Sequence, residues 1–167
     1  MLHHVSVGVA DVERAARFYD AVLGALGYAR TAQYLPYAIA YGVDAPEFWI
    51  QLPHDQGKPS PGNGVHISFA AATKDAIQEF HALAIENGGA DEGEPGPRPD
   101  YGPDYFGAFV RDLDGNKIEA TLRPEPKAAR AKPARRAKAK TKAKPAKKAK
   151  RVGRPAKPKT KRKAKRR

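Results

Sequence analysis

The chain has 167 residues and a formal net charge of +13, which is divided between an acidic and a basic part. Residues 1–124 hold nine Lys/Arg and seventeen Asp/Glu, a net charge of −8, whereas residues 125–167 hold twenty-two Lys/Arg and one Glu, a net charge of +21. The lack of cysteine excludes disulfide bonds, cysteine-based zinc sites and thiol catalysis, and no run of about 18 apolar residues indicates a membrane span.

The composition predicts one folded domain followed by a disordered tail. Residues 1–124 contain all seven Tyr, all six Phe and the single Trp, and about 124 residues suffice for a domain with a real core. In residues 125–167, Val152 is the only aliphatic residue beyond Ala, and no residue is aromatic. Such a segment cannot bury enough apolar surface to offset the entropy lost on ordering. We therefore expect a domain at 1–124 and a disordered basic tail at 125–167.

The first half of the domain predicts a strand, a helix and three short strands. Residues 3–9 alternate between apolar and polar side chains, as a half-buried strand does. Asp11 has the position of a helix N-cap, and the helical spacing of apolar residues ends at Gly24 and Gly27. Further strands are expected at 29–34, 37–41 and 47–52, and a polar linker at 53–63.

The second half predicts a similar order of elements. Residues 65–70 alternate like the first strand, with Val65 facing inward, and Thr73 has the position of a second N-cap. Four prolines indicate a loop after this helix: Pro95, Pro97, Pro99 and Pro103. Strands at 105–111 and 117–122 flank residues 112–115, which predict a hairpin turn. A calcium loop does not fit there, because Gly115 comes at the fourth position instead of the sixth.

The two halves of the domain are similar in sequence. The residues at positions 4–7, His-Val-Ser-Val, return sixty-two positions later as His-Ile-Ser-Phe, and the same offset aligns Phe18 with Phe80. A repeat of this length means that one supersecondary unit is used twice. We expect an α+β fold of two units, each a strand, a helix and three strands. Each helix would cover the apolar face of its sheet, and the other faces would line a shared cleft.

The alternation also predicts which side chains face that cleft. Four strands each place a polar residue opposite an apolar row: His4, Gln51, His66 and Glu119. Two imidazoles and a carboxylate suit a divalent metal such as Zn, Ni, Mn or Fe(II), with open positions for water or substrate. Gln51 is either a fourth ligand through its amide oxygen or a residue that orients a ligand. The alternative is a cleft that binds a small molecule without metal.

Four segments carry a resemblance to a known family: residues 4–11, 18–24, 62–67 and 109–119. Over about residues 2–123 the chain resembles the vicinal oxygen chelate superfamily, which includes glyoxalase I, bleomycin- and fosfomycin-resistance proteins and extradiol dioxygenases. The resemblance implies two βαβββ modules that form a metal-binding cleft, often between the two chains of a homodimer. It also implies that the metal chelates the vicinal oxygens of a substrate.

The resemblance places the family's metal positions on the same four residues, His4, Gln51, His66 and Glu119, and leaves the reaction open. Bacterial glyoxalase I usually has Glu where this chain has Gln51, whereas dioxygenases and fosfomycin-resistance enzymes share the His, His, Glu set. We therefore expect a metal-dependent lyase/isomerase or a dioxygenase that acts on a small molecule with vicinal oxygens. In an isomerisation, Glu119 would exchange between metal ligand and catalytic base. The alternative is a non-catalytic binding or sequestering module, as in resistance proteins.

Three residues near the proline-rich loop are candidates for substrate binding. Tyr101 and Tyr105 can donate hydrogen bonds to a substrate, and Arg98 can hold an anionic group. Packing and loop closure are the alternative roles for these side chains.

The basic tail predicts binding to nucleic acid. Its Lys/Ala/Pro units resemble the C-terminal tails of linker histones, and one segment, Arg151, Gly153, Arg154 and Pro155, resembles the core of an AT-hook. A polycation binds the phosphate backbone by releasing counterions. The alternative is a solubilising tail with incidental anionic partners. Because the N-terminus lacks the pattern of a secretory signal, we expect a cytoplasmic protein, with nucleoid association through the tail.

Overall fold

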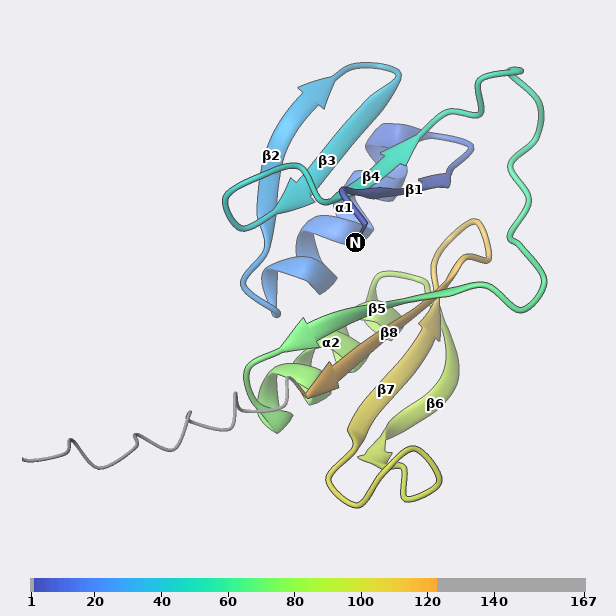
Figure 1. Ribbon diagram of the computed structural model, residues 1–167. Helices are drawn as coiled ribbons and strands as arrows, with labels where there is room; N and C mark the ends of the chain where they lie inside the picture. Colours follow the sequence, from blue (N-terminus) through green and yellow to red (C-terminus); the bar gives the residue numbers. More distant parts are fainter. Residues whose placement is uncertain (1, 123–167) are drawn as a thin grey trace, which may run out of the picture. The chain divides into compact units, whose positions relative to one another are not determined.

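The computed structural model describes residues 2–122, which form two helices and eight strands (Figure 1). In chain order the elements are β1 (Val5–Gly8), α1 (Val12–Gly24), β2 (Ala29–Tyr34), β3 (Ala38–Gly42), β4 (Phe48–Gln51), β5 (His66–Ala71), α2 (Lys74–Glu86), β6 (Ala90–Pro97), β7 (Phe106–Arg111) and β8 (Lys117–Leu122). Neither helix is long and apolar enough to cross a membrane. The predicted domain boundary, the basic tail and its AT-hook-like segment lie outside the described residues.

The strands form two four-stranded sheets with the same topology. The first sheet has the order β1-β4-β3-β2 and the second has the order β5-β8-β7-β6. In each sheet the first and last strands of the module pair in parallel, β1 with β4 and β5 with β8, and the other pairs are antiparallel. Figure 1 shows α1 against the first sheet and α2 against the second. The predicted α+β fold of two βαβββ modules is confirmed.

Both predicted N-caps begin the helices as expected. The Asp11 carboxylate accepts a hydrogen bond of 2.8 Å from the backbone N–H of Arg14, and the Thr73 hydroxyl accepts one of 3.1 Å from Ala76. Each cap satisfies an N–H that has no partner inside the helix, which contributes about 1 kcal/mol to stability.

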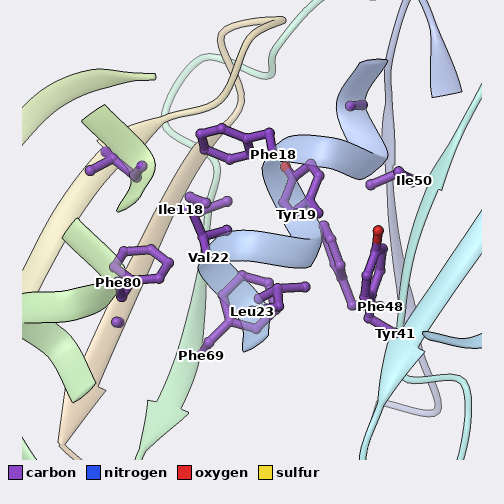
Figure 2. Close-up of a cluster of buried hydrophobic side chains, with 14 of the residues drawn as sticks. Phe18, Tyr19, Val22, Leu23, Tyr41, Phe48, Ile50, Phe69, Phe80 and Ile118 are labelled. Atoms are coloured by element: carbon purple, nitrogen blue, oxygen red, sulfur yellow. The ribbon is translucent and has the colours of Figure 1, made fainter. Parts of the chain in front are cut away.

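The two modules share one hydrophobic core, to which both helices contribute (Figure 2). Phe18, Tyr19 and Leu23 of α1 are fully buried, as is Phe80 of α2. The sheets also meet directly, because Phe48 of β4 lies edge-on to Phe69 of β5, with ring centres 5.0 Å apart. Burial of each such side chain stabilises the fold by roughly 1.5–3 kcal/mol.

The predicted loop at Pro95 and Pro97 is wrong, because these residues belong to β6. This strand lies at the edge of the second sheet and pairs only with β7, with irregular register at two places. Prolines are tolerated there because an edge strand needs partners on one side alone. Pro99 and Pro103 do lie in the connection between β6 and β7.

The predicted alternation of faces is confirmed in β4, β5 and β8, with one error before β5, whereas His4 lies just before β1. Ile50, Ile118 and Phe69 are buried against the core. The prediction that Val65 faces inward is wrong, because its exposed fraction is 61%. Its backbone N–H donates to Gly62 O in the turn that precedes β5. Val65 therefore lies outside the strand, and the alternation of strand faces does not set the direction of its side chain.

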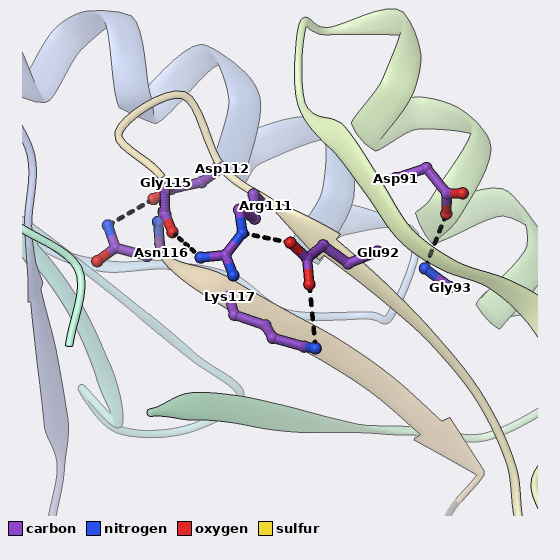
Figure 3. Close-up of polar contacts among 8 residues, drawn as sticks. All are labelled: Asp91, Glu92, Gly93, Arg111, Asp112, Gly115, Asn116 and Lys117. Carbon is purple, nitrogen blue, oxygen red and sulfur yellow. Dashed lines mark hydrogen bonds and ion pairs between the residues drawn. The ribbon is translucent and has the colours of Figure 1, made fainter. Parts of the chain in front are cut away.

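The turn between β7 and β8 joins the second module to the first. Asp112 Oδ1 accepts hydrogen bonds from the backbone N–H groups of Asp114 and Asn116, at 2.9 and 2.7 Å, which makes this segment the hairpin turn that the sequence predicted. Figure 3 shows the Asn116 amide beside Asp112. The same amide also donates to Gly8 O at 3.1 Å, and so reaches the end of β1 in the first module.

Candidate metal centre

Two of the predicted metal ligands lie in contact on the second sheet. His66 begins β5, and Glu119 lies on β8 opposite Ser68, so both side chains project from the face that α2 does not cover. The distance from His66 Nε2 to Glu119 Oε2 is 3.2 Å. The His66 side chain is 47% exposed whereas that of Glu119 is 1% exposed, so the imidazole is the more accessible donor.

Glu119 is a buried carboxylate with a partner on each oxygen. The Tyr105 hydroxyl donates a hydrogen bond of 2.5 Å to Glu119 Oε1, and Oε2 faces His66. Burial of the phenol raises the pKa of Tyr105, and the hydrogen bond to Glu119 raises this pKa further. Because a buried charge is costly without partners, these two contacts define where the carboxylate can sit.

A glycine on the neighbouring strand leaves room for this carboxylate. Gly107 lies on β7, and a Cβ atom at this position would lie 3.0 Å from Glu119 Oε1 and 3.1 Å from the backbone oxygen of Ala120. The backbone oxygen cannot move aside as the tip of a flexible side chain does. Sequence analysis missed Gly107, since its role depends on a neighbour twelve residues away in the chain.

His4 contributes to a cavity that it shares with His66. The two imidazoles line one cavity of about 470 Å³, together with Ser68 and Phe69 of β5. His4 precedes β1, and its Nδ1 lies 2.9 Å from His3 Nδ1. The His4 ring also lies edge-on to Trp49, with ring centres 6.5 Å apart. Both histidines are exposed enough to accept a ligand from solvent.

Gln51 lies apart from the other three candidates. It ends β4 opposite Gly8, four residues further along the first sheet than His4. Gln51 lines a different cavity, of about 940 Å³, whose other wall is the linker that includes Pro53 and Pro59. The strand register explains why Glu119 lies close to His66 whereas Gln51 lies far from His4. Glu119 is opposite Ser68, two positions after His66, and Gln51 is opposite Gly8, four positions after His4.

The four donors therefore suit a divalent metal in type but are not gathered within one chain. Among residues 2–122, no group of three or more His, Cys, Asp or Glu side chains is placed to hold a metal ion. His66 and Glu119 make one half-site, on the second sheet. His4 and Gln51 lie four residues apart along the open face of the first sheet and line different cavities. The pair of His66 and Glu119 alone does not supply the three or four protein ligands of a typical zinc or iron site.

The three predicted substrate contacts lie on the β6–β7 side of the His66–Glu119 pair. Arg98 donates to two backbone oxygens, Glu94 O at 2.7 Å and Pro97 O at 3.2 Å, and its guanidinium lies 5.6 Å from the ring centre of Phe109. Tyr101 is 66% exposed and lies edge-on to Tyr105. Tyr105 contacts Glu119 itself, so in this structure its hydroxyl is already engaged by the carboxylate.

Cationic side chains surround Phe109, a residue that sequence analysis did not single out. Its ring lies edge-on to His66, with centres 6.1 Å apart, and the Lys117 ammonium lies 5.1 Å from the ring centre. Figure 3 shows Glu92 between Arg111 and Lys117. Hydrogen bonds from Arg111, which has the larger effect, and from Lys117 hold the pKa of Glu92 below its usual range.

Comparisons with known proteins agree on the fold of this region. Residues 1–120 match the family described as the Glyoxalase/Bleomycin resistance protein/Dioxygenase superfamily. The lactoylglutathione lyases of Salmonella typhimurium and Escherichia coli are each 32% identical over 123 residues, which covers 71% of this chain and 89% of each relative. A glyoxalase/bleomycin resistance protein from Albidiferax ferrireducens is 40% identical, with a TM-score of 0.66 over 74% of this chain and 99% of that chain.

Proposed function

Because the chain belongs to the glyoxalase/bleomycin resistance protein/dioxygenase superfamily, we propose that it is a divalent-metal-dependent enzyme that acts on a small molecule with vicinal oxygens. The contact between His66 and Glu119 carries this proposal, because it pairs an accessible imidazole with a buried carboxylate on one sheet face. The naming of two curated relatives as lactoylglutathione lyases favours lyase or isomerase chemistry over the dioxygenase alternative.

The metal would be held by His66 and Glu119 of one chain together with His4 of a second chain, with Gln51 as a ligand or as a residue that orients one. Two copies related by a two-fold axis would bring His66 and Glu119 of each chain to His4 of the other. This arrangement would supply a third ligand to the His66–Glu119 pair, because no group of three such donors is placed to hold a metal within residues 2–122. When bound, the metal would polarise a carbonyl group of the substrate.

Glu119 is the proposed catalytic base. Its carboxylate would accept a proton from the hydroxyl-bearing carbon beside the substrate carbonyl and return it to the carbonyl carbon, while the hydroxyl proton passes to the former carbonyl oxygen, so that the product is an isomer of the substrate. The hydrogen bond from Tyr105 fixes Oε1, and Oε2, which faces His66, is the oxygen proposed to move the proton. Arg98, whose guanidinium donates to the backbone oxygens of Glu94 and Pro97, is the proposed partner of an anionic substrate group.

Metal analysis of the purified protein tests this proposal. We expect about one divalent ion per chain, turnover of lactoylglutathione or a related hydroxy-acid thioester after the metal is restored, and loss of both in His66→Ala. His81→Ala is the matched control, because His81 lies on α2, pairs with Asp91 and is outside the proposed ligand set. A metal-free protein whose ligand binding is unchanged in His66→Ala contradicts the proposal.

The second candidate function is a module that binds or sequesters a small molecule without turnover. The observation that favours it is the separation of Gln51 from the other donors, because Gln51 lines one cavity whereas His4 and His66 line another. This alternative predicts ligand binding that survives thorough chelation of metal. Stoichiometric binding by isothermal titration calorimetry in EDTA, with no product formed on metal addition, supports the module and excludes the enzyme.

The basic tail is proposed to bind nucleic acid and to place the domain near the nucleoid. The net charge of +21 in residues 125–167 supports this role. Contacts with on the order of six to ten phosphates make affinity fall roughly 10³–10⁵-fold between 50 and 200 mM salt. Gel-shift titrations of the full chain and of a chain ending at residue 124 test the tail. A preference for A·T-rich duplexes that Arg154→Ala removes supports the AT-hook-like segment, and equal retention by the shortened chain contradicts nucleic-acid binding by the tail.

A further inference from the structure

Two of the three asparagines of the chain precede a glycine, and both of these Asn-Gly pairs are exposed. Asn63 and Gly64 lie in the connection between the two modules, just before β5, whereas Asn87 and Gly88 follow α2. The backbone nitrogen that follows an asparagine can attack the side-chain amide, and glycine leaves this nitrogen unhindered because it has no side chain. The two pairs have the same local chemistry, so their reactivity depends on the hydrogen bonds around them.

The hydrogen bonds at the end of α2 hold both reacting groups of the second pair. The Asn87 side-chain amide donates to Leu83 O at 2.8 Å, and the Gly88 N–H donates to Ile85 O at 3.1 Å. Attack on the amide requires that the Gly88 nitrogen lose its proton and that the Asn87 side chain turn toward it. Both hydrogen bonds must break first, so reaction at Asn87 waits for local opening of the helix end.

The first pair lacks this protection. Within residues 2–122, neither the Asn63 side-chain amide nor the Gly64 N–H has a hydrogen-bond partner. A Cβ atom at Gly64 would meet no atom within 4 Å, so the space around the attacking nitrogen is open. The pair lies in a turn that a hydrogen bond of 3.1 Å closes, from the Val65 N–H to Gly62 O. Gly64 has a φ of +80° in this turn, a conformation that favours glycine, so the fold keeps glycine after Asn63.

We propose that Asn63 is a site of spontaneous deamidation, at which the chain acquires an isoaspartyl linkage. The Gly64 nitrogen bonds to Asn63 Cγ, and the bond from Cγ to the amide nitrogen breaks. The proton of the Gly64 N–H passes through solvent to the departing amide, which leaves as ammonia. Water then opens the cyclic imide at either carbonyl. Opening at the backbone carbonyl gives isoaspartate, in which the main chain runs through Cβ and Cγ, and opening at Cγ gives ordinary aspartate.

The modified residue lies three positions before His66, the exposed imidazole that faces Glu119. An isoaspartyl linkage adds one methylene group to the main chain inside the turn that Gly62 and Val65 close. It also replaces a neutral amide with a carboxylate. Because His66 begins β5 directly after this turn, the longer main chain displaces the start of β5 and the His66 ring.

Two variants separate the effect of the longer main chain from that of the new charge. Asn63→Ser lacks the side-chain amide, so its spectrum should not change on incubation in mildly alkaline buffer. Asn63→Asp, freshly prepared, adds the negative charge without lengthening the main chain. NMR signals of the His66 ring should move further in the incubated wild type than in Asn63→Asp, whereas those of His81 on α2 should stay in place. Equal shifts of the His66 signals in the two proteins reject the displacement of β5.

Tryptic peptide mapping tests the modification itself. Trypsin cleaves after Lys and Arg except before proline, which places Asn63 in the peptide 31–74 and Asn87 in the peptide 75–111. The full chain is incubated in mildly alkaline buffer, and isoaspartate is detected by labelling with an isoaspartyl methyltransferase. We expect Asn63 to convert roughly 10-fold or more faster than Asn87, whose two hydrogen bonds must open first. In urea the two rates should become similar. Equal rates in the folded chain, or faster conversion of Asn87, contradict the proposal.

Discussion

The Tyr105 hydroxyl donates a hydrogen bond of 2.5 Å to Oε1 of Glu119, the buried carboxylate of the proposed metal centre. Tyr105→Phe removes this donor and leaves the shape of the side chain almost unchanged. A hydrogen bond to a charged group contributes about 1.5–3 kcal/mol, so we expect metal affinity to fall about 10-fold or more. Metal titration monitored by calorimetry measures the change. Tyr101→Phe serves as the control, because Tyr101 is exposed and does not contact Glu119; equal losses in both variants contradict the positioning role.

Gly107→Ala is expected to displace the same carboxylate. The added Cβ atom would lie 3.0 Å from Glu119 Oε1 and 3.1 Å from Ala120 O, so the side chain or the strand must shift. We expect a loss of metal binding together with a destabilisation of about 1–3 kcal/mol, the usual cost of overpacking. Urea unfolding and metal titration measure the two effects. Gly24→Ala is the comparison, since a Cβ there meets no atom within 4 Å; normal metal binding in Gly107→Ala disproves the spatial constraint.

Gln51→Glu is expected to tighten metal binding. A carboxylate oxygen is a stronger ligand for a divalent cation than an amide oxygen. The affinity for Ni²⁺ or Zn²⁺ should rise about 10-fold or more, measured by competition with a chelator of known affinity. Gln78→Glu adds the same charge on the exposed face of α2 and should have no effect. If the metal affinity of Gln51→Glu is unchanged, Gln51 is not part of the metal centre.

Stability at alkaline pH should depend on Tyr19. This buried phenol donates a hydrogen bond of 2.7 Å to Asp112 Oδ2, and burial, with the nearby Asp112 charge, raises the pKa of Tyr19 well above its usual value. The folded state therefore binds the Tyr19 proton more tightly than the unfolded state. Its contribution is complete below about pH 10, the pKa of an unfolded tyrosine, and is lost as the pH rises further. Thermal unfolding between about pH 8 and 11 should show a steeper fall for the wild type than for Tyr19→Phe. Parallel curves contradict the assignment.

Local sequence patterns predicted the elements because their causes are local. A side chain that caps a helix acts within three residues, so Asp11 and Thr73 could be identified without knowledge of the fold. The alternation of strand faces likewise follows from the period of two, and it placed Glu119 and His66 on the same face. The strand β6 could not be predicted in this way. Its Gly and Pro residues suggest a loop, and only its pairing with β7 at the sheet edge makes it a strand.

The site was less predictable because it depends on register and on distant contacts. Alternation gives the face of Gln51 but not its level along the sheet, which the pairing of Val5 with Phe48 sets. The contact of Tyr105 with Glu119 likewise arises from the hairpin of β7 and β8, so the sequence suggested a substrate contact instead. Gly107 could be identified only from the space that Glu119 needs.

The central claim is that two chains complete one metal centre, with His4 from one copy and His66 and Glu119 from the other. The most direct measurement is the metal content of an equimolar mixture of His4→Ala and His66→Ala after the subunits have exchanged. Each variant alone should bind little metal. In the mixture about half of the dimers are mixed, and each of these has one intact centre, so about a quarter of the wild-type metal should return. Recovery near this level supports the claim, and a mixture that binds no more metal than the separate variants contradicts it.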